Sequence, residues 1–216
     1  MKSYISIVLI LIINLSAMTL KEAYDLGQPS GEYDKVVILE KGQVYEGGIF
    51  LGWFYNPFTY NDEKLDEINV KIEGYGAIID LKNGQINFGY TGNKLDIDSC
   101  VILNGTVRFS GCSNGAGGYI IPFGSIKNVT FYNSIDYGVR LESAGLDMEI
   151  NKNLVVNCIT TGPDFPQYNS LPTDFLRTGT SYSFSMFPWF GIPEITENWS
   201  YNDRYIDEPM IHFSML

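Results

Sequence analysis

Two aspartates that alternate with apolar residues are the first candidates for a functional site. They are Asp96 and Asp98, in the stretch Leu95-Asp96-Ile97-Asp98. Because successive side chains of a β-strand point to opposite faces, both carboxylates would lie on one face of a strand. Carboxylate oxygens are the ligands that Ca²⁺ prefers. The alternation therefore predicts a metal site at Asp96 and Asp98 with Ca²⁺ as the cofactor, and a solvated strand face is the alternative.

A second candidate joins a carboxylate to an arginine. Asp136 and Arg140 are four residues apart and would share one face of a regular strand. An arginine held in this way could neutralise an acidic sugar or act as the base of a lyase, which makes the two residues catalytic candidates. The alternative is a surface ion pair, worth less than about 1 kcal/mol.

Tryptophans in aromatic stretches are candidates for substrate binding. Trp53 opens an aromatic segment, 53–60, that we expect to protrude as a loop, and Trp189 and Trp199 lie in an aromatic, proline-rich tail. Aromatic rings can stack on the apolar faces of sugars. The alternative for the tail is a cap that covers the end of the core.

Composition excludes several other kinds of chemistry. The chain of 216 residues has one histidine, His212, so histidine triads and two-histidine metal sites are excluded. Its formal net charge is −11, which argues against nucleic acid as a partner.

Short strands recur along the chain and predict the element that positions these residues. Apolar–x–apolar units that end in Gly, Asn or Cys begin at residues 70, 101, 129 and 154, so they are 31, 28 and 25 residues apart. A second short strand follows each of the first three. Such a period predicts an all-β solenoid, in which asparagines at matching corners form hydrogen-bonded ladders. Asn83-Gly84 and Asn104-Gly105 resemble hairpin turns and keep an antiparallel β-sandwich as the alternative.

Residues 67–80, with the sequence EINVKIEGYGAIID, resemble the early coils of the pectin-lyase-like superfamily. Residues 35–45 and 125–134 are similar to other parts of those proteins, so the resemblance covers about residues 35–160. It implies a right-handed parallel β-helix and a glycan-related role, as a polysaccharide lyase or glycoside hydrolase. The alternative is a non-catalytic solenoid that binds glycans or a cell surface. The polygalacturonase and pectate-lyase signatures of the family are absent.

The N-terminus predicts export. Residues 1–17 combine one lysine, an apolar run and small residues at the far end, as in a signal peptide, and the run is too short for a membrane span. We therefore expect a secreted protein with coils over 24–160 and an irregular aromatic cap over 161–216. Cys100, Cys112 and Cys158 are expected to be buried thiols, although a disulfide between the first two is possible on spacing.

Overall fold

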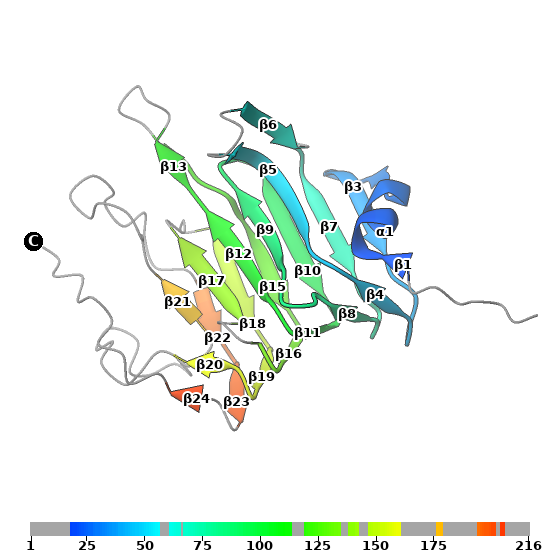
Figure 1. Cartoon of the computed structure of the whole chain (residues 1–216), viewed down its shortest axis with the longest axis vertical. Helices are drawn as coiled ribbons and strands as arrows, with labels where there is room; N and C mark the ends of the chain where they lie inside the picture. Colours follow the sequence, from blue (N-terminus) through cyan, green and yellow to red (C-terminus); the bar gives the residue numbers. More distant parts are fainter. Residues whose placement is uncertain are drawn as a thin grey trace, which may run out of the picture.

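The chain folds as an all-β protein made mostly of parallel sheets, as a parallel β-helix requires. The computed structural model describes residues 18–56, 61–65, 67–113, 119–134, 138–142, 147–160, 176–178, 194–201 and 204–205. Among these residues there is one helix, α1 (Leu20–Leu26), and it is too short to cross a membrane. Figure 1 shows the strands stacked along one axis, with α1 at one end.

Three sheets form the walls of the solenoid. Sheet A contains β1 (Met18–Thr19), β4 (Val44–Glu46), β8 (Ile78–Asp80), β11 (Val101–Leu103), β16 (Thr130–Tyr132), β19 (Leu154–Val156) and β23 (Trp199–Tyr201). Sheet B contains β2 (Gln28–Ser30), β3 (Tyr33–Ile38), β7 (Val70–Glu73), β10 (Lys94–Asp98), β15 (Phe123–Lys127), β18 (Met148–Asn151) and β22 (Glu194–Thr196). Sheet C contains β21 (Leu176–Thr178), β17 (Val139–Glu142), β12 (Thr106–Ser110), β9 (Gln85–Gly89), β5 (Ile49–Asn56) and β6 (Asn61–Leu65). The remaining strands are β13 (Cys112–Ser113), β14 (Tyr119–Ile120), β20 (Ile159–Thr160) and β24 (Arg204–Tyr205).

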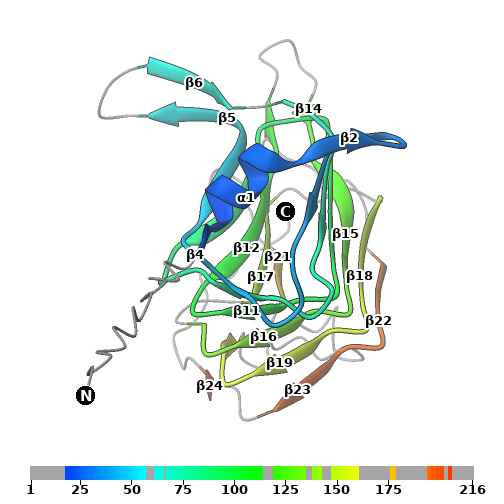
Figure 2. The same cartoon turned by 90° about the vertical axis from the view of Figure 1, so that its right-hand side faces the viewer.

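Each coil runs from sheet B to sheet A and then to sheet C, and the next coil repeats the order (Figure 2). Neighbouring coils pair in parallel and in register, so one residue of each strand falls in the same inward row. In sheet C such a row holds Leu51, Phe88, Phe109 and Leu141, all buried. Burying a side chain of this size stabilises the fold by about 1.5–3 kcal/mol. The stacked rows of the three sheets make one continuous core.

The corner between sheets A and C is built from asparagines in the left-handed backbone conformation. Asn104, Asn133 and Asn157 have φ values of 52°, 56° and 55°. Asn133 Nδ2 donates to Asn104 Oδ1 at 2.9 Å, and Asn157 Nδ2 donates to Asn133 Oδ1 at 2.9 Å. Asparagine tolerates this conformation better than most residues. The predicted asparagine ladder is therefore confirmed.

A second asparagine pair is buried at the corner between sheets B and A. Asn153 is fully buried, and its Oδ1 accepts a hydrogen bond from the Val129 backbone N–H at 2.9 Å. Its Nδ2 donates to the carbonyl oxygen of Ile126 and to Oδ1 of Asn198, each at 2.9 Å. The two side chains satisfy backbone groups that the turns would otherwise leave buried and unpaired.

The N-terminal end of the core is covered by α1. Thr19 caps the helix in a capping box with Glu22, and the helix buries Leu20, Ala23 and Tyr24. Lys35 Nζ lies 4.1 Å from the centroid of the Tyr24 ring, a cation–π contact with β3. The helix thereby shields the first coil from solvent.

The segment after Gly52 was expected to be an irregular protruding loop, and it is a hairpin. β5 continues beyond its parallel partner β9 and pairs antiparallel with β6, with Trp53 opposite Lys64. Figure 2 shows this hairpin projecting from the solenoid. β6 carries Asp62, Glu63 and Lys64 at the edge of sheet C, and charged residues on an edge strand disfavour pairing with another chain.

Two details of the predicted repeat differ from the structure. The unit that begins at Val70 belongs to sheet B, whereas the later units lie in sheet A, because V-x-I and V-x-L patterns suit both walls equally. Strands β21 to β24 pair in parallel with β17 to β20, so parallel pairing extends past the boundary expected at residue 160.

The antiparallel sandwich is excluded by the parallel pairing. Asn83-Gly84 and Asn104-Gly105 lie at corners between sheets A and C, so neither pair closes a hairpin.

Replacing Asn153 by Leu tests the buried corner. Leucine has a similar volume but cannot pair with Val129 N–H or Ile126 C=O, so we expect a loss of about 2–5 kcal/mol in the free energy of unfolding, from two orphaned groups. Urea unfolding measures it. The control is Asn128→Gly, which keeps a left-handed corner and removes one exposed hydrogen bond to Asp98; equal losses in the two variants would refute the role of Asn153.

Candidate functional site

Three arginines occupy one register row of sheet C. β12 pairs with β17 in parallel so that Arg108 is opposite Arg140, and β17 pairs with β21 so that Arg140 is opposite Arg177. Three of the chain's four arginines therefore occupy one row of neighbouring strands. Adjacent strands are about 4.8 Å apart, which sets the step of the row.

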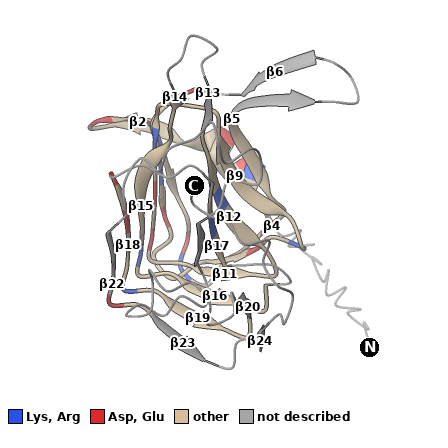
Figure 3. Ribbon diagram, turned by 90° about the vertical axis from the view of Figure 1, so that its left-hand side faces the viewer, with Lys and Arg blue, Asp and Glu red and all other residues tan. Residues whose placement is uncertain are grey.

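Local sequence explains why Arg108 and Arg140 point outward. Val107 and Phe109 flank Arg108, Val139 and Leu141 flank Arg140, and all four apolar residues are fully buried. Strand alternation then places both arginines on the outer face, where each is partly exposed. Figure 3 shows β12 and β17 next to each other in this wall.

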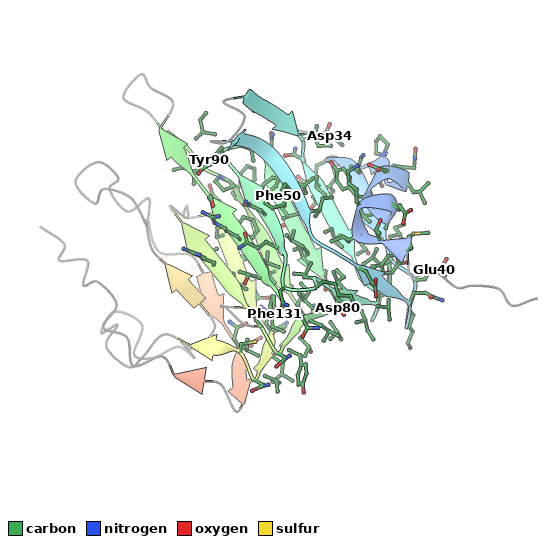
Figure 4. All side chains as sticks on the ribbon, in the orientation of Figure 1. Asp34, Glu40, Phe50, Asp80, Tyr90 and Phe131 are labelled. Carbon is green, nitrogen blue, oxygen red and sulfur yellow. The ribbon has the colours of Figure 1, made fainter. Side chains whose placement is uncertain are left out.

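The same row continues toward the N-terminal end of the solenoid with uncharged residues. Asn87 is opposite Arg108, and Phe50 is opposite Asn87. The Phe50 side chain is 48% exposed, and Figure 4 shows it on β5. From one end to the other, the row thus presents an aromatic ring, an amide and three arginine positions.

A second outward row runs parallel to the first and consists of small residues followed by one acid. Gly52, Gly89, Ser110 and Glu142 occupy its successive positions. Of these residues, Gly89 and Ser110 are buried. By register, the two rows hold three arginines and one glutamate, in a chain whose formal charge is −11.

On sheet B, several outward charges form ion pairs with one another. Lys71 pairs with Glu73, and Lys127 pairs with Glu149. This mutual pairing makes sheet B a poor candidate for binding a charged ligand.

Asp96, one of the predicted metal ligands, is 92% buried on the outer face of sheet B, since its exposed fraction is 8%. Its Oδ2 accepts a hydrogen bond from the Tyr33 hydroxyl and lies 3.2 Å from Lys94 Nζ. Its Oδ1 accepts from Ser125 Oγ at 2.8 Å. Both carboxylate oxygens are therefore already engaged.

Asp98 shares the face, as the alternation predicts, but has its own partners. Its Oδ1 accepts from Ser99 Oγ at 2.6 Å and from Asn128 Nδ2 at 3.0 Å. No group of three or more His, Cys, Asp or Glu side chains suited to a metal ion occurs within the described residues. The Ca²⁺ site at Asp96 and Asp98 stays a prediction.

Tyr33 and Lys94 connect the antiparallel strands β2 and β3 to the cluster around Asp96. Lys94 Nζ donates to Glu32 Oε1 at 2.9 Å and to the Tyr33 hydroxyl at 3.2 Å. The hydrogen bond to Glu32 is the main reason that the pKa of Lys94 is raised. The pKa of Tyr33 is raised above its ordinary 10.0, chiefly by burial and then by its hydrogen bond to Asp96.

The other predicted site residues are spread over the molecule. Arg140 lies in the arginine row, whereas Asp136 and Trp189 lie outside the described residues. Trp53 is in β5 of sheet C and Trp199 is in β23 of sheet A, opposite Leu154, so the fold places these two tryptophans on different walls.

The cysteine prediction is confirmed for two residues. Cys100 and Cys158 are free thiols and both are buried. Burial raises the pKa of the Cys100 thiol to about 12, so it is a packing residue and not a reactive thiolate. Cys112 lies in β13, outside the described side chains.

Sequence reasoning missed Arg108 and Arg177 as companions of Arg140. The signal was present, because Val-Arg-Phe, Val-Arg-Leu and Leu-Arg-Thr each place an arginine directly after an apolar strand residue. Aligning these three phrases as successive coils would have predicted the row.

The comparisons with protein-family models, with curated proteins and with solved structures find no match to this chain. The class of protein that the fold defines is a parallel β-helix. Its distinguishing feature is the row of arginines on sheet C.

Tyr33→Phe tests the cluster around Asp96. The variant loses a hydrogen bond to a carboxylate, so the free energy of unfolding should fall by about 1 kcal/mol at neutral pH. Because the pKa of Tyr33 is raised on folding, its contribution is present below pH 10 and is lost as the pH rises through the folded pKa.

Urea unfolding from pH 7 to pH 11 therefore should show a steeper alkaline loss in the wild type than in Tyr33→Phe. Tyr132→Phe, at an exposed tyrosine of sheet A, is the control. Identical slopes for the wild type and Tyr33→Phe would contradict this account.

Proposed function

We propose that this protein binds an extended acidic glycan along the outer face of sheet C. The observation that supports the proposal is the register of Arg108, Arg140 and Arg177 on three neighbouring strands. A guanidinium binds a carboxylate with two parallel hydrogen bonds, which gives it both strength and geometric selectivity. The row thus offers a series of carboxylate-binding groups in a straight line.

The spacing of the row suits a polymer better than a small molecule. Each coil advances the row by about 4.8 Å, and a sugar unit in an extended glycan advances by a comparable distance. One coil then serves one unit of the chain. The exposed ring of Phe50, in the same row, adds a surface on which a sugar face can stack.

Membership of the pectin-lyase-like superfamily is part of the proposal. It is supported by the resemblance of residues 67–80 and by the parallel pairing of β7, β10 and β15. We propose binding as the primary function, because the arginine row is a feature repeated over successive coils.

Removing single arginines tests the proposal. Arg108→Gln and Arg140→Gln each remove one carboxylate-binding group, so each should weaken binding of oligogalacturonate by about tenfold, the equivalent of about 1.4 kcal/mol. Added salt should weaken wild-type binding, because the contacts are ionic and partly exposed. Isothermal titration calorimetry with pectin, alginate and xylan fragments measures both effects.

Lys152→Gln is the matched control, since it removes the same charge from an exposed residue at the corner between sheets B and A. The proposal would be overturned if the protein bound uncharged xylan as tightly as pectin. It would also be overturned if Lys152→Gln and Arg140→Gln lost the same affinity for pectin. Reducing ends or unsaturated products formed from any of these glycans would show that the site is catalytic.

Export is also proposed, on the signal-like pattern of residues 1–17. β1 begins at Met18 and pairs with β4, so cleavage after Ala17 leaves every described strand intact. Mass spectrometry of the protein recovered from the culture medium should find an N-terminus near Met18. Retention of the full chain inside the cells would refute export.

A further inference from the structure

Asn87 carries an unmet hydrogen-bonding group beside the arginine row. It lies in β9 between Phe50 and Arg108, and with an exposed fraction of 9% it is about nine-tenths buried. Its Oδ1 is buried and has no hydrogen-bond partner among the residues that the structure describes. A buried acceptor left unpaired costs about 1–3 kcal/mol. Stability of the strand alone therefore does not account for an asparagine at this position.

The unpaired oxygen lies at the edge of the row of small residues. A Cβ added to Gly89 would lie 3.3 Å from Asn87 Oδ1 and 3.5 Å from Ser110 Cβ. Gly52, the next residue of that row, has a φ of +95°, and a Cβ there would lie 2.1 Å from the carbonyl oxygen of Gly89. The backbones approach so closely there that position 52 cannot carry a side chain. Asn87 Oδ1 therefore lies beside small residues on one side and next to Arg108 in its own row.

From this arrangement we infer that Asn87 binds a sugar hydroxyl of a glycan that lies along the arginine row. This inference rests on the proposed function and makes it more specific. An amide oxygen accepts hydrogen bonds and does not donate them. A carboxylate or phosphate oxygen has no proton to offer at neutral pH, whereas a sugar hydroxyl has one. The unpaired oxygen of Asn87 therefore favours binding of a polyanion that carries hydroxyls over binding of one that lacks them.

We infer that side-chain movement gives a ligand access to this oxygen. Phe50 and Arg108 flank Asn87 in the row, and both are partly exposed. Changes of rotamer at an interface are common on binding, even where the backbone stays fixed. A ligand carboxylate that draws Arg108 outward would uncover the amide for the hydroxyl of the adjoining sugar unit.

Two polyanions and one substitution test the inference. Oligogalacturonate offers carboxylates and hydroxyls, and inorganic polyphosphate of similar length offers charge without carbon-bound hydroxyls. Asn87→Leu should weaken oligogalacturonate binding by about tenfold while changing polyphosphate binding by less than about twofold. Its free energy of unfolding should be unchanged or higher, because the variant removes an unpaired acceptor.

A purely structural Asn87 would give a different result. Binding of both polyanions would then be unchanged, or both would fall together with a loss of stability, and either outcome overturns the inference while the arginine row still binds. If neither polyanion binds the wild-type protein, the proposed function itself fails.

Gly89→Ala supplies a second variant, which keeps the amide but puts a methyl group 3.3 Å from its oxygen. The methyl group crowds the side of the oxygen that would accept the hydroxyl, so it should also weaken oligogalacturonate binding selectively. Gly92→Ala is its control, because a Cβ there meets only Ile120, at 3.9 Å. Equal binding of oligogalacturonate by Gly89→Ala, Gly92→Ala and the wild type would overturn the inference.

Discussion

The structure depends on one constraint, which is that every coil must turn at the same place as the coil before it. Parallel strands pair in register only if the corners coincide, and the corners coincide because residues in the left-handed conformation recur there. Asn104, Asn133 and Asn157 hold one corner, and Ser99, Asn128 and Lys152 hold the next. A shift of one residue at a corner would exchange the inward and outward faces of the following strand. The positions of the corners therefore determine both which side chains pack in the core and which ones line up on the surface.

This coupling explains how the molecule obtains a basic row on an acidic chain. Once Val107 and Phe109 enter the core, Arg108 must face outward, and register then brings it beside Arg140. No contact between the arginines is needed to align them. The energy that places two like charges about 4.8 Å apart comes from the buried rows on either side.

The solenoid and its asparagine ladders were predictable because short apolar units and asparagine corners repeat along the sequence. The assignment of strands to walls was not, since Val70-Lys71-Ile72 and Val101-Ile102-Leu103 follow the same pattern on different sheets. The site was only partly predictable. Arg140 was identified, but its partners come from other coils and depend on register. Asp96 and Asp98 share a face as predicted, yet Tyr33, 63 residues from Asp96 in the sequence, reaches that carboxylate across the one intervening strand, β7.

The row also has a direction. It begins at Phe50, on the coil nearest α1, and its arginines follow only toward the C-terminal coils. A chain with distinguishable ends would meet a different group at each step, so the two orientations of such a chain would not be equivalent. Each coil contributes one position to the row. A gene that gains or loses a whole coil would therefore lengthen or shorten the row by one position, and the remaining positions would keep their register.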